Sequence, residues 1–249
     1  DDMADEGDAP ASKRLKQIDA WESLLERCPN ENLDQPVFLA LGDAIQKFEL
    51  PIEELHNLLI AFRMDVSIHS YATVDELMFY CKHSANPVGR LMLSLHGVSG
   101  SEVERYSDAV CTALQLTNFW QDLKIDIPNG RCYLAEAWLK ESGLSSEEVL
   151  NSNSSLTSEQ LWPALRLAIA KTEALYQEGF NILPHLPFRL RLQIAATLHG
   201  GMAILKATSE LSDPVNNRPA LTKKAWYGLA ANVLKSTLWP KQGINMGSV

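Results

Sequence analysis

Five polar side chains form a regular series along one otherwise apolar segment, which its hydrophobic periodicity predicts to be a helix over 102–126. They are separated by seven, three, four and four residues and so share one helix face: Asp108, Gln115, Asn118, Asp122 and Asp126. Carboxylate and amide oxygens are hard ligands, and proteins typically hold Mg²⁺ by one or two carboxylates together with substrate phosphates. The series therefore predicts a cavity lining that binds Mg²⁺ and a phosphorylated substrate.

Asp122 and Asp126 stand one turn apart at the end of this predicted helix. Like charges at that spacing cost roughly 0.2–0.5 kcal/mol, and the helix dipole disfavours anions there by a further roughly 0.3–1 kcal/mol. Because local structure gains nothing from them, we favour a metal site over the alternative of a solvated charged face. Asp1 and Asp5 repeat the same spacing. An acidic terminus alone is usually a solvated tail, but the match suggests two helices whose paired carboxylates hold several Mg²⁺ ions on a diphosphate.

A proline interrupts a third segment, YCKHSANPVGR at 80–90, inside a helix predicted over 73–96. Pro87 should kink this helix, because its ring blocks one backbone hydrogen bond. The residues around the kink include three small ones, Ser84, Ala85 and Gly89. Small side chains let either a neighbouring helix or an elongated ligand approach closely, and both interpretations stay open.

The elements that must position these groups are predicted to be helices throughout. Hydrophobic residues recur with a period near 3.6, while Gly and Pro concentrate between the periodic stretches. Helices are predicted over 12–27, 35–48, 52–67, 73–96, 102–126, 157–182, 186–208 and 221–236, with shorter turns near 134–141 and 146–151. The expected fold class is all-α. No linker is long enough to divide the chain, so residues 1–249 are predicted to form one helical domain.

Composition argues against several other classes of protein. The formal net charge of −9 and the sequence pI near 5.2 disfavour nucleic-acid binding. Four cysteines without a Cys-x-x-Cys pair indicate neither a disulfide framework nor a zinc cluster. No apolar run is long enough to span a membrane, and the acidic start is no signal peptide. We expect a cytoplasmic protein, and, because the chain begins without Met in a patterned acidic segment, a fragment lacking its N-terminal helix or helices.

Three blocks together carry a resemblance to a known family: DDMADEG, YCKHSANPVGRL and QLTNFWQDLKIDIPNGRCYL. In this order they resemble the squalene/phytoene synthases, which are head-to-head prenyltransferases. The resemblance covers residues 1 to about 207, and the block from 115 to 134 is highly specific. It implies an isoprenoid-synthase helical fold with a central cavity between two Asp-rich helices, which bind Mg²⁺ and the diphosphate of a prenyl substrate.

Carried over by position, the resemblance assigns roles to individual residues. The implied metal ligands are Asp1, Asp5, Asp122 and Asp126. The implied catalytic residues are Tyr80, beside the reacting carbons, together with Gln115, Asn118, Asp122 and Asp126. The expected substrate-binding residues are Ser84, Asn86, Pro87, Val88 and Arg131, the last directly after the Pro-Asn-Gly turn. The triplet Arg63-Met64-Asp65 resembles a Met-Asp signature of the family.

Two departures from the usual family pattern narrow the expected activity. Residues 83–87 replace the Val-Ala-Gly that commonly follows the Tyr-Cys pair, and Gln121 stands where many relatives have Arg. Both features resemble bacterial hydroxysqualene synthases of hopanoid pathways. The implied reaction is Mg²⁺-dependent conversion of presqualene diphosphate and water to hydroxysqualene and diphosphate, without nicotinamide. We expect Ser84 or Asn86 to position the water.

Two alternatives stay open at this point. One is a sibling activity, condensation of two farnesyl or two geranylgeranyl diphosphates to presqualene diphosphate, squalene or phytoene. The other is a non-catalytic family member that acts as an assembly subunit. Four intact aspartates argue against the second alternative, because a scaffold has no reason to tolerate their mutual repulsion.

The C-terminal end differs in charge from the rest of the chain. After Asp213 it carries five basic residues and no acidic one, and Trp226 and Trp239 accompany the lysines. This composition suits a helix lying on an anionic membrane surface, while the alternative is an ordinary terminal helix packed on the domain. We therefore expect peripheral contact with the inner face of a bacterial membrane, and contact with other enzymes of the pathway.

Overall fold

The computed structural model describes residues 9–151 and 156–240, and for residues 223–225 only the backbone. Within these ranges the regular elements are helices, apart from one isolated parallel bridge between Ser70 and Cys132, so the predicted all-α class is confirmed. The longer helices are α2 (Ala11–Arg27), α3 (Pro36–Phe48), α4 (Ile52–Ser67), α5 (Val74–Ser84), α6 (Asn86–Leu95), α7 (Ser101–Gln121), α11 (Ser158–Gly179), α12 (Phe188–Ser209) and α13 (Lys223–Leu238). The short ones are α8 (Leu123–Asp126), α9 (Glu136–Leu139), η1 (Lys140–Ser142), α10 (Ser146–Leu150) and η2 (Phe180–His185).

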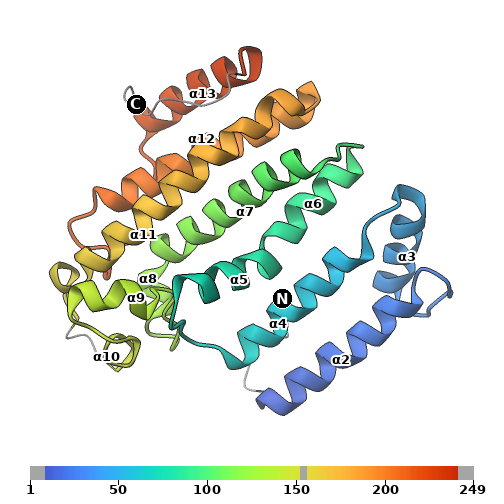
Figure 1. Ribbon diagram of the computed structural model, residues 1–249, viewed down its shortest axis with the longest axis horizontal. Coiled ribbons are helices and arrows are strands. Elements are labelled where there is room, and N and C mark those ends of the chain that lie inside the picture. Colours follow the sequence, from blue (N-terminus) through green and yellow to red (C-terminus); the bar gives the residue numbers. More distant parts are fainter. Residues whose placement is uncertain (1–8, 152–155, 241–249) are drawn as a thin grey trace.

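The helices succeed one another across the molecule in nearly the order of the chain. Figure 1 shows α2 and α4 at one side, then α5 and α6, then α7, and finally α11, α12 and α13 at the other side. Packing between α7 and α6, α11 and α12 makes α7 central. The main hydrophobic core surrounds α7, and a smaller one joins α2, α3 and the outer face of α4. That residues 1–249 form one domain stays a prediction.

Side-chain caps explain several helix starts. Thr73 begins α5 through a capping box in which its hydroxyl accepts from the backbone N–H of Glu76 and the Glu76 carboxylate accepts in return. The starts of α10 and α11 carry the same arrangement. The helix α7 begins without a side-chain cap: Ser101 is its first residue, and Gly100 occupies the cap position with φ +128°.

Two helices predicted as continuous are broken in the structure. The stretch over 73–96 divides at Ala85 into α5 and α6, with Pro87 as the second residue of α6, because proline fits a first turn and disrupts an interior one. The stretch over 102–126 divides at Asp122, whose φ and ψ of −106° and 16° leave the helical range. Backbone bonds from Asp122 to Asn118 and from Asp126 to Asp122 keep the one-turn spacing.

The contact between α6 and α7 depends on one glycine. A Cβ atom at Gly89 would overlap the hydroxyl of Ser107 and lie 2.6 Å from the sulfur of Cys111. A larger residue at this position would therefore force the side chains of Ser107 and Cys111 or the helices themselves to move. Close helix packing, one of the two interpretations of the small residues near Pro87, is confirmed at this position.

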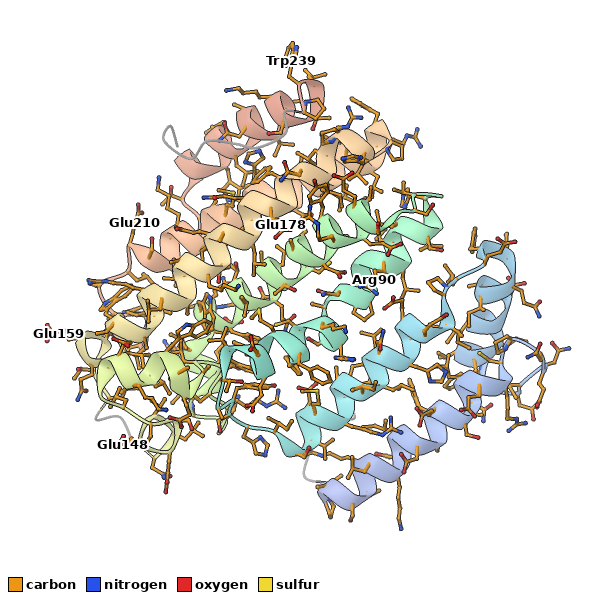
Figure 2. All side chains as sticks on the ribbon, viewed as in Figure 1. Arg90, Glu148, Glu159, Glu178, Glu210 and Trp239 are labelled. Carbon is orange, nitrogen blue, oxygen red and sulfur yellow. The ribbon has the colours of Figure 1, made fainter. Side chains whose placement is uncertain are left out.

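None of the helices in the described ranges is long and apolar enough to cross a membrane. The helix α13 packs on α12 and buries Val233 and Thr237. Its other faces leave five large apolar side chains exposed: Trp226, Tyr227, Leu234, Leu238 and, just beyond the helix, Trp239. Figure 2 shows Trp239 projecting away from the rest of the molecule.

Candidate active site

The polar series on α7 divides into two parts with different surroundings. Arg90 of α6 donates two hydrogen bonds to Asp108, with Nε–Oδ1 and Nη2–Oδ2 distances of 3.0 and 2.7 Å, and a third, of 2.9 Å, to Glu54 of α4. Figure 2 labels Arg90 at this junction. Asp108 thus takes part in a three-helix ion network. Its place in the ligand-binding series stays a prediction, and the period did not reveal its partner on another helix.

The other four members lie together at the C-terminal end of α7. Asn118 is exposed, while Gln115, Asp122 and Asp126 are half-buried. The guanidinium of Arg218, in the connection between α12 and α13, binds both carboxylate oxygens of Asp122, with a 2.5 Å Nε–Oδ1 distance and a 3.3 Å Nη2–Oδ2 distance. The sequence interpretation missed Arg218, since 96 residues separate the partners. The Asp122 carboxylate is thus accessible and already paired with the Arg218 guanidinium.

The connection that carries Arg218 is anchored at two points. Asp213 accepts a 2.5 Å hydrogen bond from the hydroxyl of Ser158 at the start of α11. Hydrogen bonds from Ser158 and Asn216 lower the pKa of the Asp213 carboxyl. The side-chain amide of Gln121 donates to the carbonyl of Pro219 at 3.4 Å. Together these contacts hold the connection beside the end of α7.

Asp122 and Asp126 could supply some of the ligands of a Mg²⁺ ion but not all of them. They offer hard oxygen donors one turn apart, and Mg²⁺ is commonly bound by one or two carboxylates plus substrate oxygens. Within residues 9–151 and 156–240, no group of three or more acidic, His or Cys side chains is arranged to hold a metal. Asp1 and Asp5, and the helix predicted to carry them, lie outside the described residues.

A tight turn brings the backbone of Arg131 to the backbone of Asp126. Gly130 has φ +76°, and the backbone N–H of Arg131 donates to the carbonyl of Asp126 at 2.9 Å. The Arg131 guanidinium also donates to the hydroxyl of Tyr133 at 3.4 Å. Arg131 therefore joins the acidic end of α7 to an aromatic cluster behind it.

That aromatic cluster contains Tyr80 and three rings from other parts of the chain. Phe119 of α7 stacks on Tyr133 at 3.6 Å between centroids, with an interplanar angle of 5°. Tyr80 of α5 lies 5.8 Å from Tyr71, 6.1 Å from Phe119 and 6.2 Å from Tyr133. All four rings are at least nine-tenths buried. Sequence reasoning found Tyr80 through the family resemblance and missed the cluster, because its members share no period.

Backbone hydrogen bonds explain why this cluster forms. The bridge between Ser70 and Cys132 lays the segment after the Pro-Asn-Gly turn along the loop between α4 and α5. The N–H of Cys132 donates to the carbonyl of His69 at 2.8 Å, and that of Glu136 donates to Tyr71 at 2.9 Å. These bonds hold the two segments side by side, and Tyr71 and Tyr133 both enter the aromatic cluster as a result.

Burial keeps the phenols of the cluster protonated. Burial, followed by neighbouring charges that include Asp65, raises the pKa of Tyr80 far above its usual range, and burial does the same for Tyr71. Burial raises the pKa of Tyr133 to about 12, against the opposing charge of Arg131. At neutral pH each group is a neutral hydroxyl, which can donate one hydrogen bond and accept others.

The predicted substrate-binding residues near the helix break have different environments. Asn86 is buried and accepts a 2.9 Å bond from the hydroxyl of Thr112, and Pro87 is buried beside it. Val88 is 53% exposed, on the outer surface of α6. The hydroxyl oxygen of Ser84 is buried and has no hydrogen-bond partner among the described residues. The Ser84 hydroxyl therefore has hydrogen-bonding capacity left for a ligand.

Two cavities lie away from these residues. One, of about 610 Å³, lies between α11, α12 and α13 and is lined by Tyr176, His199 and Leu229 among others. Another, of about 550 Å³, lies beside α3 and the end of α2. None of the sequence-predicted site residues lines either cavity.

Comparison with known proteins identifies the class that this fold and site define. The squalene/phytoene synthase family model matches residues 1–225. A hydroxysqualene synthase from Sinorhizobium fredii (strain NBRC 101917 / NGR234) is 34% identical over 224 residues, which cover 89% of this chain and 74% of that protein. A phytoene synthase from Mycobacterium tuberculosis is 30% identical over 98% of this chain and 80% of its own.

A solved structure agrees with the sequence matches. The crystal structure of squalene synthase HpnC from Alicyclobacillus acidocaldarius superposes with a TM-score of 0.75 at 34% identity, covering 83% of this chain and 76% of that one. The chain therefore belongs to the squalene/phytoene synthase family. The predicted isoprenoid-synthase fold and the resemblance given by the three sequence blocks are both confirmed.

Proposed function

We propose that the protein is a Mg²⁺-dependent enzyme that converts presqualene diphosphate and water to hydroxysqualene and diphosphate. The observation that carries the proposal is that Arg131 adjoins two unlike environments, because its backbone N–H donates to the carbonyl of Asp126 and its guanidinium donates to the hydroxyl of Tyr133. On one side lie the carboxylates of Asp122 and Asp126, and on the other the buried rings of Phe119 and Tyr133. A diphosphate leaving group requires the first environment, and an apolar carbocation requires the second.

In the proposed reaction, the carbon–oxygen bond to the diphosphate breaks and both electrons leave with the oxygen. A bound Mg²⁺ would supply Lewis-acid stabilisation of that leaving group. Asp122 and Asp126 would hold the metal, and Gln115 and Asn118 line the same end of α7. The Arg131 guanidinium supplies hydrogen-bond donors for phosphate oxygens in a geometry that suits them.

The carbocation then rearranges beside the aromatic cluster. The faces of Phe119, Tyr80 and Tyr133 carry negative partial charge, which attracts a cation without reacting with it. Ser84 lies one turn after Tyr80 on α5 and so on the same face. We infer that its unpartnered hydroxyl holds the water, whose oxygen forms the new bond and releases one proton. Asn86 is a weaker candidate, since its carbonyl oxygen is already bonded to Thr112.

The test is product analysis with full-length protein, Mg²⁺ and presqualene diphosphate in H₂¹⁸O, without nicotinamide. Mass spectrometry should find hydroxysqualene carrying one ¹⁸O atom, with one diphosphate released per product. Asp122→Asn should abolish this product, and Ser84→Ala should divert it to unhydroxylated hydrocarbon. An unhydroxylated C30 hydrocarbon from wild-type protein, formed by loss of a proton in place of water capture, would overturn the hydroxysqualene assignment.

The sibling activity has support of its own, because the mycobacterial phytoene synthase matches nearly the whole chain. Incubation with farnesyl or geranylgeranyl diphosphate separates the two. Formation of presqualene diphosphate or phytoene would keep the metal site and change the substrate. If no substrate turns over and no Mg²⁺-dependent diphosphate binding is measured, the non-catalytic assembly role replaces the enzymatic one.

We further propose that α13 contacts an anionic membrane surface. Its exposed tryptophans and leucines form an apolar surface beside the exposed Lys235, a combination that suits the lipid headgroup region. Co-sedimentation with vesicles containing anionic lipid should recover the protein, and neutral vesicles should recover much less. Trp226→Ser with Trp239→Ser should abolish recovery, whereas equal recovery on both vesicle types would refute charge recognition.

A further inference from the structure

The cavity of about 610 Å³ between α11, α12 and α13 is lined largely by apolar side chains. Figure 1 shows these three helices side by side at one edge of the molecule. Tyr176, Phe180 and Leu205 line the cavity and are almost fully buried, and Met202 and Leu229 add further apolar surface. Its volume lies within the range of roughly 300–1,000 Å³ that is typical of small-molecule sites. The cavity is therefore large enough to hold a ligand.

The side of the cavity that adjoins α7 is rigid. The hydroxyl of Tyr176 lies 2.9 Å from that of Thr117 on α7, and Thr117 donates its own proton to the carbonyl of Ala113 at 2.7 Å. Tyr176 is thus the donor in its bond to Thr117, and its ring is held at the contact between α11 and α7. A ligand would find this side of the cavity already formed, which lowers the entropic cost of binding.

Small residues line the cavity from both α12 and α13, namely Ala203, Ala207 and Gly228. Small residues usually let two helices approach closely, and Gly201 of α12 does so, because a Cβ atom there would overlap the hydroxyl of Tyr176. A Cβ atom at Gly228, by contrast, would meet no described atom within 4 Å. The small residues between α12 and α13 therefore leave space open instead of closing a contact.

The charges around the cavity disfavour an anionic ligand. Among its described lining residues, Glu173 and Glu210 supply two carboxylates and Lys206 the one ammonium group. Figure 2 labels Glu210 at the outer edge of the molecule. Burial lowers the pKa of His199, so this ring is neutral at neutral pH. A diphosphate would meet more negative than positive charge here, whereas the neutral amide of Asn232 can bind a hydroxyl group.

The cavity lies beneath the part of α13 that carries exposed aromatic side chains. Gly228 and Leu229 line it, and the two residues directly before them, Trp226 and Tyr227, are 57% and 81% exposed. Because 3.6 residues make one turn of a helix, a single turn of α13 presents both the cavity lining and an apolar outer surface. A lipid that passes between the protein and a bilayer would contact this turn.

We propose that this cavity binds a neutral, long-chain isoprenoid lipid. The apolar lining encloses the chain, and Asn232 binds a hydroxyl group where the lipid has one. Relatives of this chain are named for squalene and phytoene, and both of these lipids are neutral isoprenoids. The chemical class of the ligand thus follows from the lining and the family, while its identity as hydroxysqualene rests on the proposed function.

The test is photolabelling of the full-length protein with a diazirine analogue of farnesol, a neutral isoprenoid alcohol. Peptide mapping by mass spectrometry should find the label in α12 around Ala203 and in α13 around Leu229. Excess farnesol should displace this label, and farnesyl diphosphate should displace much less of it. Label confined to segments that do not line the cavity would overturn the proposal, as would equal displacement by the two competitors.

Gly228→Leu fills the cavity from the side of α13. It replaces a glycine inside a helix and enters open space, so it should not lower stability. Each methylene group of the ligand that it displaces should weaken binding about fourfold, and labelling at Ala203 should fall by at least about that factor. Ala203→Phe fills the same space from α12. Undiminished labelling of the cavity segments in both variants would overturn the proposal.

Ala231→Leu is the matched control. Ala231 is exposed on the same helix and does not line the cavity, so this variant adds similar apolar surface and should keep the wild-type labelling. An equal loss in Ala231→Leu would show that the label reports the outer surface of α13, which would contradict a site in the cavity.

The labelling requires no turnover, which separates this inference from the proposed function. Labelled cavity segments in a protein that does not convert presqualene diphosphate would support the lipid site and reject the proposed function. Hydroxysqualene formation without label in α12 and α13 would retain the proposed function and reject the lipid site.

Discussion

Two aspartate–arginine pairs, one within α7 and one directly after its last residue, have similar carboxylates and different arginines. The side chains of Asp108 and Asp122 are 24% and 25% exposed, and each receives two bonds from one guanidinium. Arg90 is 30% exposed, belongs to a helix and also binds Glu54. Arg218 is 53% exposed and belongs to a connecting segment. The two pairs therefore differ in how exposed the arginine is and in which element carries it.

This contrast separates a structural charge pair from a replaceable one. Arg90 is committed to two acids on two other helices, so removing it leaves two partly buried charges without their partner. Arg218 binds a single acid at an accessible edge, where water or another cation can take its place. The same residue types thus join three helices at one end of α7, while at the other end the proposed function assigns them to a metal site.

The largest expected effect is the loss of activity in Asp122→Asn. Because a metal ligand stabilises the leaving group in the transition state, we expect product formation to fall by at least about 100-fold. The free energy of unfolding should change by less than about 1 kcal/mol, as is typical for accessible pairs. Product analysis and urea unfolding measure the two quantities on the same preparation.

Asp108→Asn is the matched variant for this measurement. It should reverse the pattern, with kcat near the wild-type value and a clear loss of stability, because its partner Arg90 lies between three helices. If Asp108→Asn proved inactive while fully stable, the two ends of α7 would belong to one site, and the division drawn here would be wrong.

The next largest effect is the loss of stability in Arg90→Met. Breaking a fully buried pair costs about 3–5 kcal/mol; with these side chains partly exposed, we expect about 2 kcal/mol. Thermal or urea unfolding measures it directly. Arg218→Met is the control, with an expected loss of less than about 1 kcal/mol. Equal losses in the two variants would remove the distinction between helix-borne and connection-borne arginines.

The sequence alone predicted the helical architecture well. Hydrophobic period and turn residues placed nearly every long helix to within a few residues. The breaks at Ala85 and Asp122 were missed in detail, because a period shows which face is apolar and not where one residue leaves the helical range. Asn118, Asp122 and Asp126 do lie together, as their spacing required.

Residues that meet only through tertiary structure escaped prediction. Arg218 reaches Asp122 across 96 positions, and Tyr133 reaches Tyr80 through a bridge that no local pattern announces. Asp65 drew attention only through the family resemblance. Asp108 fitted the polar series perfectly and still belongs to an ion network. Spacing identifies residues on a shared face, but their roles depend on the elements packed against that face.

A smaller effect concerns the competition between Arg218 and a metal ion for Asp122. An exposed pair worth 0.2–1 kcal/mol corresponds to a competition factor of up to about fivefold. Arg218→Gln should therefore raise the affinity for Mn²⁺, used as a paramagnetic substitute for Mg²⁺, by up to about that factor. Water proton relaxation measures Mn²⁺ binding without any turnover. In Asp122→Asn the same substitution should have no effect, and a lower affinity in Arg218→Gln would show that Arg218 supports the metal site.

The smallest expected effect is a pH dependence that limits the range in which both pairs should be compared. Burial lowers the pKa of His199, whose Nε2 lies 2.8 Å from the Ser236 hydroxyl in the contact between α12 and α13. The unfolded chain then binds the His199 proton more readily than the folded chain does. The contribution of His199 to the free energy of unfolding is therefore fully present above about pH 6.5 and declines as the pH falls below it. His199→Gln should flatten the unfolding free energy between pH 7 and pH 5. The Arg90 and Arg218 variants should be compared above this range, where His199 is neutral in both states; an equally steep decline in His199→Gln would assign the titration to another group.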